Sequence, residues 1–263
     1  MSADQAVRRI RLTLSGHPVP AVLISYAMAG FPRIDDTVPM LLAAEAAGVK
    51  MVELGLPYSD PLADGPVVQS AGQRALGNGM TVARALAQVQ EAREGGLAIP
   101  LVVMTYLNPL LRMGLGHFCE LAARSGVDGI LVPDLPLEEM AELAGLAEDH
   151  GIAMNTMVAP TTPSSRIARA GGLSTGFIYC VSRTGVTGAA ASARDEGTSL
   201  LQRARQNTDA PLVLGFGVRS AEQVRAVTGL ADGVVVASLL LEEAAAAADP
   251  VEAVARKIRE LRA

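Results

Sequence analysis

The sequence predicts an α/β protein, folded as a closed (β/α)₈ TIM barrel with an extra N-terminal helix. Eight short apolar runs, rich in β-branched residues, alternate with helical segments, as expected for parallel strands covered on both faces. Eight such repeats in 263 residues fit one barrel domain spanning residues 1–263. The competing open sheet normally has a G-x-G-x-x-G turn after its first strand, and SYAMAGFPRID, which starts at Ser25, lacks one.

The predicted strands start at fairly regular intervals along the chain. They are AVLISYA (21–27), MVELG (51–55), PLVVMTY (100–106), GILVPD (129–134), AMNTMV (153–158), TGFIYCV (175–181), PLVLGFG (211–217) and GVVVAS (233–238). Helical apolar spacing, often ending in glycine, marks segments between them, namely 35–48, 81–95, 137–151 and 220–233. Val7, Ile10 and Leu14 recur at helical spacing, which predicts an amphipathic N-terminal helix lying on the core.

Composition narrows the class of protein. A net charge of −5 and a pI near 5.3 argue against nucleic acid as the main ligand, because phosphate backbones attract basic surfaces. The N-terminus has no apolar segment long enough for a signal peptide or a membrane span. Cys119 and Cys180 fall in different predicted elements, so we expect two free buried thiols and a cytoplasmic location.

Glu53 is the sharpest catalytic candidate. Alternation along the strand 51–55 puts Val52 and Leu54 on the helix-packing face and points Glu53 into the barrel. Burial disfavours a charged carboxylate and therefore raises its pKa toward the range useful for proton transfer. The alternative, a glutamate neutralised by a buried arginine, finds no arginine on the predicted strands.

The loop DPLADGP supplies a second carboxylate. In such barrels, catalytic groups come from the carboxyl ends of the strands and the loops that follow. Asp60 and Asp64 both lie there, and a turn aspartate that bonds its own backbone is the ordinary alternative for each. We prefer Asp64 as a partner of Glu53, because two carboxyl groups in unlike surroundings can divide acid and base roles.

Glycine-rich segments after the last three strands predict a phosphate site. They are SRTGVTG with Gly188, GFG ending at Gly217, and VVVAS leading to Ser238 at the start of a helix. Phosphate in these barrels commonly binds backbone N–H groups and a helix N-terminus after strands seven and eight. A small phosphorylated substrate is therefore expected.

The sequence offers no candidate residues for Schiff-base formation or for metal binding. Lys50 and Lys257 are the only lysines, and neither is placed inside the predicted barrel, so no Schiff-base nucleophile is expected. His17, His117 and His150 have no metal-ligand spacing, so no metal site is expected.

These motifs resemble the tryptophan synthase alpha subunit family. VELGLPYSDPLADGP, Gln69 and SRTGVTG carry the resemblance, which extends through PAVLISYAMAGFP, LNPLL, DGILVPDLPLEE and GFGV. It implies a lyase that cleaves indole-3-glycerol phosphate, by a retro-aldol reaction, to indole and glyceraldehyde 3-phosphate. It also implies that Glu53 is the general acid/base and that Asp64 stabilises charge at the indole N–H.

The resemblance assigns further site residues. Tyr179 is expected beside the glycerol, and Thr187 is expected to hydrogen-bond Asp64. The expected indole pocket comprises Tyr26, Tyr106, Leu131 and Phe216, and the expected phosphate site comprises Gly188, Gly217, Ala237 and Ser238. Two positions depart from the family pattern: Ala237 stands where glycine is frequent, and Phe31 where aspartate is frequent.

A partner is also implied by the resemblance. The expected partner is a pyridoxal-phosphate β subunit in an αββα tetramer, while this chain itself carries no cofactor. The implied contacts are Pro57, Asp60, Asn108 and Pro136, although loop rigidity alone also explains the two prolines. The alternatives are a stand-alone indole-releasing lyase, which shares these motifs, and another phosphate-binding barrel, such as an isomerase or indole-glycerol phosphate synthase. The synthase needs lysines inside the barrel, and they are missing. A non-catalytic allosteric barrel would be expected to lack Glu53 or Asp64, and both are present.

Overall fold

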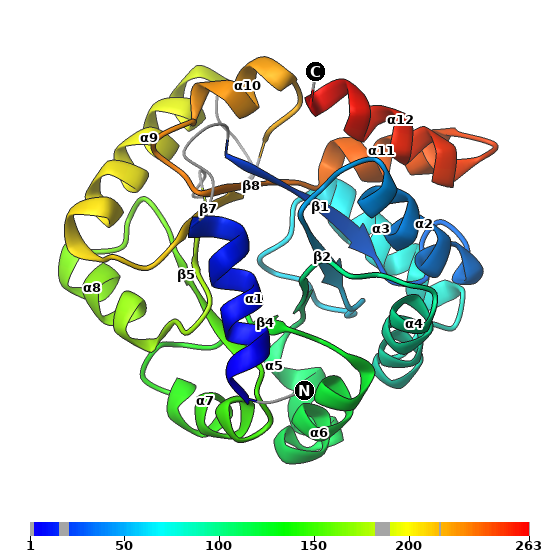
Figure 1. Ribbon diagram of the computed structural model, residues 1–263, viewed down its shortest axis with the longest axis horizontal. Helices are drawn as coiled ribbons and strands as arrows, with labels where there is room; N and C mark the ends of the chain where they lie inside the picture. The colour runs from blue at the N-terminus through cyan, green and yellow to red at the C-terminus, as the bar shows by residue number, and fades with distance from the viewer. Residues whose placement is uncertain (1–2, 16–20, 182–189, 216, 263) are drawn as a thin grey trace.

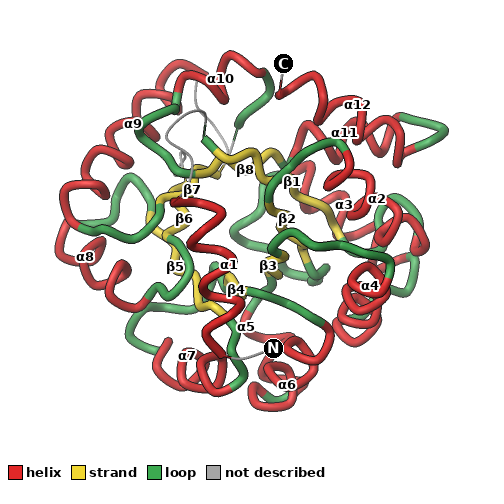
Figure 2. The backbone as a smooth tube through the Cα atoms, in the orientation of Figure 1, coloured by secondary structure: helices red, strands yellow, loops and turns green. Residues whose placement is uncertain are grey.

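The chain folds into a closed barrel of parallel strands surrounded by helices (Figure 1; Figure 2). The computed structural model describes residues 3–15, 21–181, 190–215 and 217–262. Neighbouring strands follow chain order from β1 to β8, and β1 pairs with β8 to close the ring. The predicted TIM barrel is therefore confirmed.

The strands coincide with the apolar runs, although several end earlier than predicted. They are β1 (Val22–Met28), β2 (Met51–Gly55), β3 (Leu101–Met104), β4 (Gly129–Leu131), β5 (Ala153–Val158), β6 (Ile178–Val181), β7 (Leu212–Gly215) and β8 (Gly233–Val236). These strands end early because the chain leaves the hydrogen-bonded sheet at the carboxyl end of the barrel. Thr105 and Asp134, predicted at strand ends, thus lie in loops, whereas Ser238 begins α11.

The helices follow the predicted alternation. They are α1 (Ala3–Ser15), α2 (Thr37–Ala46), α3 (Pro66–Gly77), α4 (Val82–Glu94), α5 (Leu107–Met113), α6 (Leu115–Ser125), α7 (Met140–Asp149), α8 (Ser164–Leu173), α9 (Ala190–Asn207), α10 (Ala221–Ala226), α11 (Ser238–Ala246) and α12 (Pro250–Arg262). The helix predicted over 220–233 is too long. It ends at Ala226, because Gly229 takes a φ of 82° and a turn follows.

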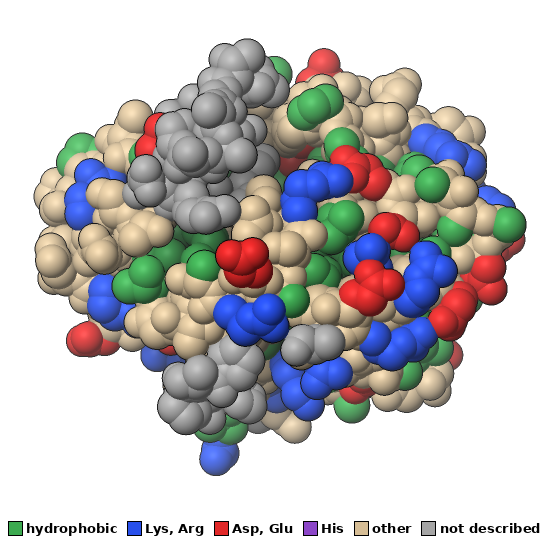
Figure 3. Space-filling view, turned by 90° about the horizontal axis from the view of Figure 1, so that it is seen from above, with side chains coloured by type: hydrophobic (Ala, Val, Ile, Leu, Met, Phe, Trp, Pro, Cys, Tyr) green, Lys and Arg blue, Asp and Glu red, His purple; other side chains and the backbone are tan. Residues whose placement is uncertain are grey.

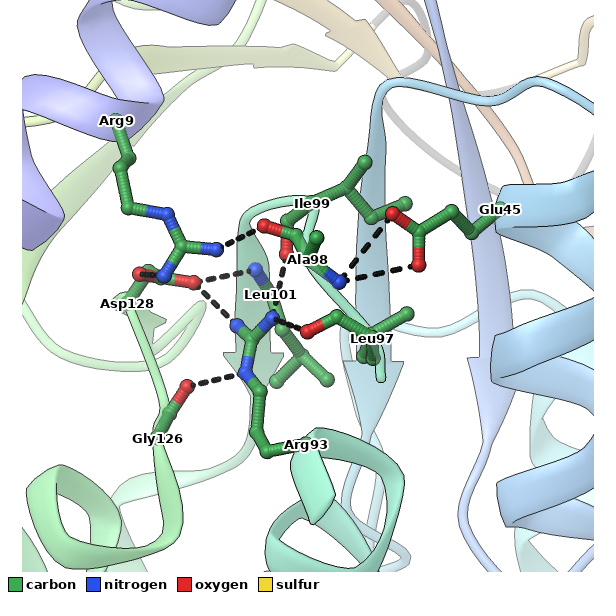
Figure 4. Close-up of polar contacts among 9 residues, drawn as sticks. All are labelled: Arg9, Glu45, Arg93, Leu97, Ala98, Ile99, Leu101, Gly126 and Asp128. Atoms are coloured by element: carbon green, nitrogen blue, oxygen red, sulfur yellow. Dashed lines mark hydrogen bonds and ion pairs between the residues drawn. The ribbon is translucent and has the colours of Figure 1, made fainter. Parts of the chain in front are cut away.

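Helix α1 lies across the amino-terminal end of the barrel (Figure 1). Ile10 and Leu14 are fully buried there, as the helical spacing predicted. A buried carboxylate, Asp128, anchors this end: it accepts hydrogen bonds from Arg9 at 2.9 Å and Arg93 at 2.5 Å (Figure 4). Its second oxygen also accepts the Leu101 N–H at 2.8 Å, so α1, α4 and β3 meet at one side chain.

The surface mixes both signs of charge. Acidic and basic side chains are interspersed on the face seen in Figure 3. On α12, Arg259 pairs with Glu252 at 2.5 Å and Lys257 pairs with Glu243 at 3.2 Å. Cys119 and Cys180 are free and buried, as predicted. In the part of the chain that the structure describes, no helix has the length and apolar character needed to cross a membrane.

Candidate active site

The structure places Glu53 inside the barrel. Its side chain is on β2, in register with Tyr26 on β1 and Val102 on β3, and the residue is 1% exposed. Burial, and then the charge of Glu53, raise the pKa of Tyr179, which lies on β6 on the far side of the ring. Only a side chain in the interior can act on residues from both sides of the barrel.

The surroundings of Glu53 keep its carboxyl group protonated. Neither carboxyl oxygen has a hydrogen-bond partner among the described residues. Burial, and then the charge of Asp64, raise the pKa of Glu53 from 4.5 to about 8. Glu53 is therefore a neutral acid at pH 7 that can give up its proton at little cost.

Asp64 is held above this acid by the loop between β2 and α3. Its N–H donates to the carbonyl of Pro61 at 3.1 Å, and its own carbonyl accepts from Gln69 at 2.9 Å. Burial raises the pKa of Asp64 to about 6, and a hydrogen bond from Tyr106 partly offsets that rise. Asp64 is thus mostly ionised at pH 7, while Glu53 is mostly protonated.

Tyrosines and a leucine line the interior around the two carboxyl groups. Tyr26, Tyr106, Tyr179 and Leu131 are all buried. Burial, which is the largest cause, raises the pKa of each tyrosine, so all three stay neutral phenols. The site therefore offers apolar ring surfaces with two carboxyl groups among them, a setting suited to a flat aromatic ligand.

Of the predicted phosphate residues, Gly217 follows β7, and Ala237 and Ser238 follow β8. Gly217 has a φ of 80°, and Ser238 is the first residue of α11, with Ala237 at its N-cap. The helix therefore begins where the sequence placed it. Thr187, Gly188 and Phe216 lie outside the described residues.

The predicted partner contacts divide into exposed and buried positions. Asp60, Asn108 and Pro136 are exposed, whereas Pro57 is buried within this chain. Asn108 donates to the Tyr58 hydroxyl at 3.1 Å, and the Tyr58 ring lies 5.3 Å from that of Tyr106. The exposed surface near Asn108 is thus connected to the interior through two tyrosines.

Sequence reasoning missed Tyr58 and the role of two glycines. A β-carbon on Gly55 would lie 2.0 Å from the Tyr26 hydroxyl, and one on Gly215 would lie 2.1 Å from the Tyr179 ring. Each glycine lies two residues beyond the strand partner of its tyrosine. That offset is readable from the sequence once the strand register is known.

Proton-transfer chemistry is what this interior supports. TIM-barrel enzymes carry their catalytic groups at the carboxyl ends of the strands, and carboxyl groups with separated pKa values divide acid and base work. In the described part of the chain, no group of three or more His, Cys, Asp and Glu side chains could hold a metal ion. The fold and the site together define a TIM-barrel enzyme whose buried carboxyl groups are the candidates for proton transfer.

Comparisons with known proteins identify the family. The model of the tryptophan synthase alpha chain family matches residues 17–263. The tryptophan synthase alpha chain of Shouchella clausii is 46% identical over 222 residues, which cover 84% of this chain and 82% of that protein.

Comparison with solved structures indicates the same family. The tryptophan synthase alpha subunit of Legionella pneumophila superposes with a TM-score of 0.87 at 30% identity, covering 97% of each chain. A chain of the tryptophan synthase complex from Pyrococcus furiosus gives 0.84 at 36% identity, covering 92% of this chain and 98% of that one.

The chain belongs to the tryptophan synthase alpha chain family. Members of this family are lyases that cleave indole-3-glycerol phosphate to indole and glyceraldehyde 3-phosphate in tryptophan biosynthesis. The reaction expected from the sequence motifs is therefore the reaction of the family.

Proposed function

We propose that this chain, acting as one catalytic domain, cleaves indole-3-glycerol phosphate with Glu53 as the proton carrier. The observation that carries the proposal is the state of Glu53: its carboxyl group is buried, lacks a hydrogen-bond partner among the described residues, and has a pKa of about 8. A buried carboxylic acid with that pKa is protonated at pH 7 and can donate its proton to carbon.

The proposed steps return Glu53 to its starting state. Glu53 first gives its proton to indole C3, which makes the ring an electron acceptor. The resulting carboxylate then takes the proton of the glycerol hydroxyl next to the scissile bond. The electron pair of the carbon–carbon bond moves into the ring, releasing indole, and the oxygen that lost its proton becomes the aldehyde of glyceraldehyde 3-phosphate.

Asp64 and the phosphate loops have supporting roles in this proposal. Positive charge builds up on the indole ring when C3 is protonated, and an ionised Asp64 near the N–H stabilises it. Its pKa of about 6 leaves it ionised at pH 7. We propose that the phosphate binds near the N-terminus of α11, held by Gly188, Gly217, Ala237 and Ser238.

We also propose a β-subunit partner, in an αββα tetramer, and a cytoplasmic location. The expected surface includes Asp60, Asn108 and Pro136, and two apolar side chains near it are exposed, Leu62 at 93% and Leu111 at 56%. A matching Pyrococcus furiosus chain comes from a tryptophan synthase complex. Pyridoxal phosphate is expected in the β subunit, and this chain is proposed to work without a cofactor.

Indole release from indole-3-glycerol phosphate tests the proposal. The parent chain and Glu53→Gln are assayed with and without a β subunit, and Glu91→Gln, an exposed glutamate of α4, is the matched control. We expect Glu53→Gln to lose at least about 10³-fold in kcat, while Glu91→Gln equals the parent. Parent-like turnover by Glu53→Gln refutes the role of Glu53. Full activity without a β subunit favours the stand-alone lyase.

A further inference from the structure

Asp134, in the loop after β4, is connected to the candidate site through one backbone group. Its Oδ1 accepts the Leu107 N–H at 2.9 Å. Leu107 is the first residue of α5, and the preceding residue, Tyr106, makes no side-chain capping bond to that helix. The first N–H groups of a helix lack partners within it, so Asp134 supplies one from a neighbouring loop.

Tyr106 extends from this tethered position to the catalytic loop. Its hydroxyl accepts the Ala63 N–H at 3.0 Å, and it lowers the pKa of the Asp64 carboxyl group by acting as a donor toward it. One phenol thus holds both the backbone and the side chain of the segment that carries Asp64. The bond from the Ala63 N–H requires the Tyr106 ring to keep its place to within a few tenths of an ångström.

We propose that Asp134 is a positioning residue for the lyase reaction, which fixes Tyr106 and thereby places the Asp64 carboxylate. The inference rests on the proposed role of Asp64. It extends that role to a residue on a different loop, whose side chain accepts the Leu107 N–H. The hydrogen bond uses its acceptor oxygen, while its charge, after burial and Asp64, also raises the pKa of Tyr106.

The groups that face Asp64 determine how its pKa changes when Tyr106 is displaced. Tyr106 comes from the N-cap of α5, Glu53 from β2, Tyr26 from β1 and Tyr179 from β6, and all four interact with Asp64 electrostatically. Of these, only Tyr106 lowers the pKa of Asp64, through its hydrogen bond. A displaced Tyr106 therefore raises that pKa and leaves less Asp64 ionised at neutral pH.

The test compares kcat/KM as a function of pH for full-chain variants. Asp134→Ala removes the acceptor, Asp134→Asn keeps an acceptor oxygen, and Tyr106→Phe removes the hydroxyl. We expect Asp134→Ala to lower kcat/KM about fivefold and to move the acidic limb of the profile to higher pH. Asp134→Asn should stay near the parent, because its Oδ1 can still accept the Leu107 N–H.

A double variant separates positioning from general damage. Asp134→Ala combined with Tyr106→Phe should lose no more than Tyr106→Phe alone, because both changes break one pathway. Glu139→Gln, an exposed glutamate of the same loop, is the control for charge and should match the parent. Circular dichroism checks folding, and Asp134→Ser, too short to reach Leu107, replaces Asp134→Ala should that variant fail to fold.

Three outcomes overturn the inference: an unchanged profile in Asp134→Ala, equal losses in Asp134→Asn and Asp134→Ala, or fully additive losses in the double variant. Asp64→Asn distinguishes failure of the inference from failure of the proposed function. Should Asp64→Asn retain activity, the role of Asp64 itself is wrong. Should it be inactive while Asp134→Ala equals the parent, only the positioning role is wrong.

Discussion

The hydroxyl of Tyr26 occupies the space that a side chain on Gly55 would need. The two residues lie on neighbouring strands, and a β-carbon on Gly55 would be 2.0 Å from that oxygen. Tyr179 and Gly215 repeat the arrangement on β6 and β7. In both pairs the missing side chain gives a tyrosine ring room beside the buried Glu53.

Gly55→Ala should therefore displace Tyr26. We expect a loss of about 1–3 kcal/mol in the free energy of unfolding, as for other overpacked interiors, and a lower kcat. Urea unfolding and indole release measure the two effects. Adding Tyr26→Phe removes the closest clashing atom and should recover part of the stability; no recovery would show that Tyr26 is not the obstacle.

The dependence of kcat/KM on pH should be bell-shaped. The reaction as proposed needs Asp64 ionised, with its pKa of about 6, and Glu53 protonated, with its pKa of about 8. Activity should thus fall below about pH 6 and above about pH 8. Asp64→Asn should lower kcat/KM strongly and move the basic limb to lower pH, because its charge helps to raise the pKa of Glu53. A basic limb that stays in place contradicts this coupling.

Glu53→Gln should stabilise the protein increasingly as pH rises. The folded pKa of Glu53, about 8, is above its ordinary value of 4.5, so its stabilising contribution is complete below pH 4.5 and is lost as pH rises through 8. Glutamine does not titrate. The difference in unfolding free energy between variant and parent should grow by on the order of 5 kcal/mol between about pH 4 and pH 9. Urea unfolding at both pH values measures it, and a constant difference refutes the raised pKa.

Asp128→Ala should destabilise the amino-terminal end of the barrel. The side chain of Asp128 is 0% exposed and binds Arg9, Arg93 and the Leu101 N–H. Removing one partner of a buried ion pair leaves uncompensated charge, so we expect a loss of about 3–5 kcal/mol in thermal or urea unfolding. Glu252→Gln, in an exposed pair with Arg259, should change stability little.

Ser238→Ala should weaken phosphate binding without altering the chemical step. Loss of one hydrogen bond to a charged oxygen should raise KM about tenfold with kcat nearly unchanged. Ser164 is the first residue of α8, as Ser238 is of α11, and it is exposed, whereas Ser238 is half-buried; Ser164→Ala is therefore the control for loss of a hydroxyl at a helix start. Inorganic phosphate should inhibit the parent and the control more strongly than Ser238→Ala; equal inhibition contradicts the site.

Much of the fold and the main candidate follow from local patterns. Period-two alternation in MVELG is enough to point Glu53 inward, and the eight apolar runs are enough to count the strands. The helix predicted over 220–233 is too long because apolar spacing continues past Ala226, where the helix ends. Gly229 has a positive φ and lies in the turn through which the chain returns to β8, and local spacing does not record that turn.

The sequence by itself determined the barrel, the buried acid and the second carboxylate on the next loop, because each depends on residue type and spacing along one segment. Only the tertiary structure decided how segments far apart act on one another. The pKa values of Glu53 and Asp64 depend on burial by the whole ring, and the hydrogen bond from the Leu107 N–H to Asp134 joins the loops after two neighbouring strands, β3 and β4. Desolvation and hydrogen-bond geometry are set by three-dimensional distances, which no local pattern records.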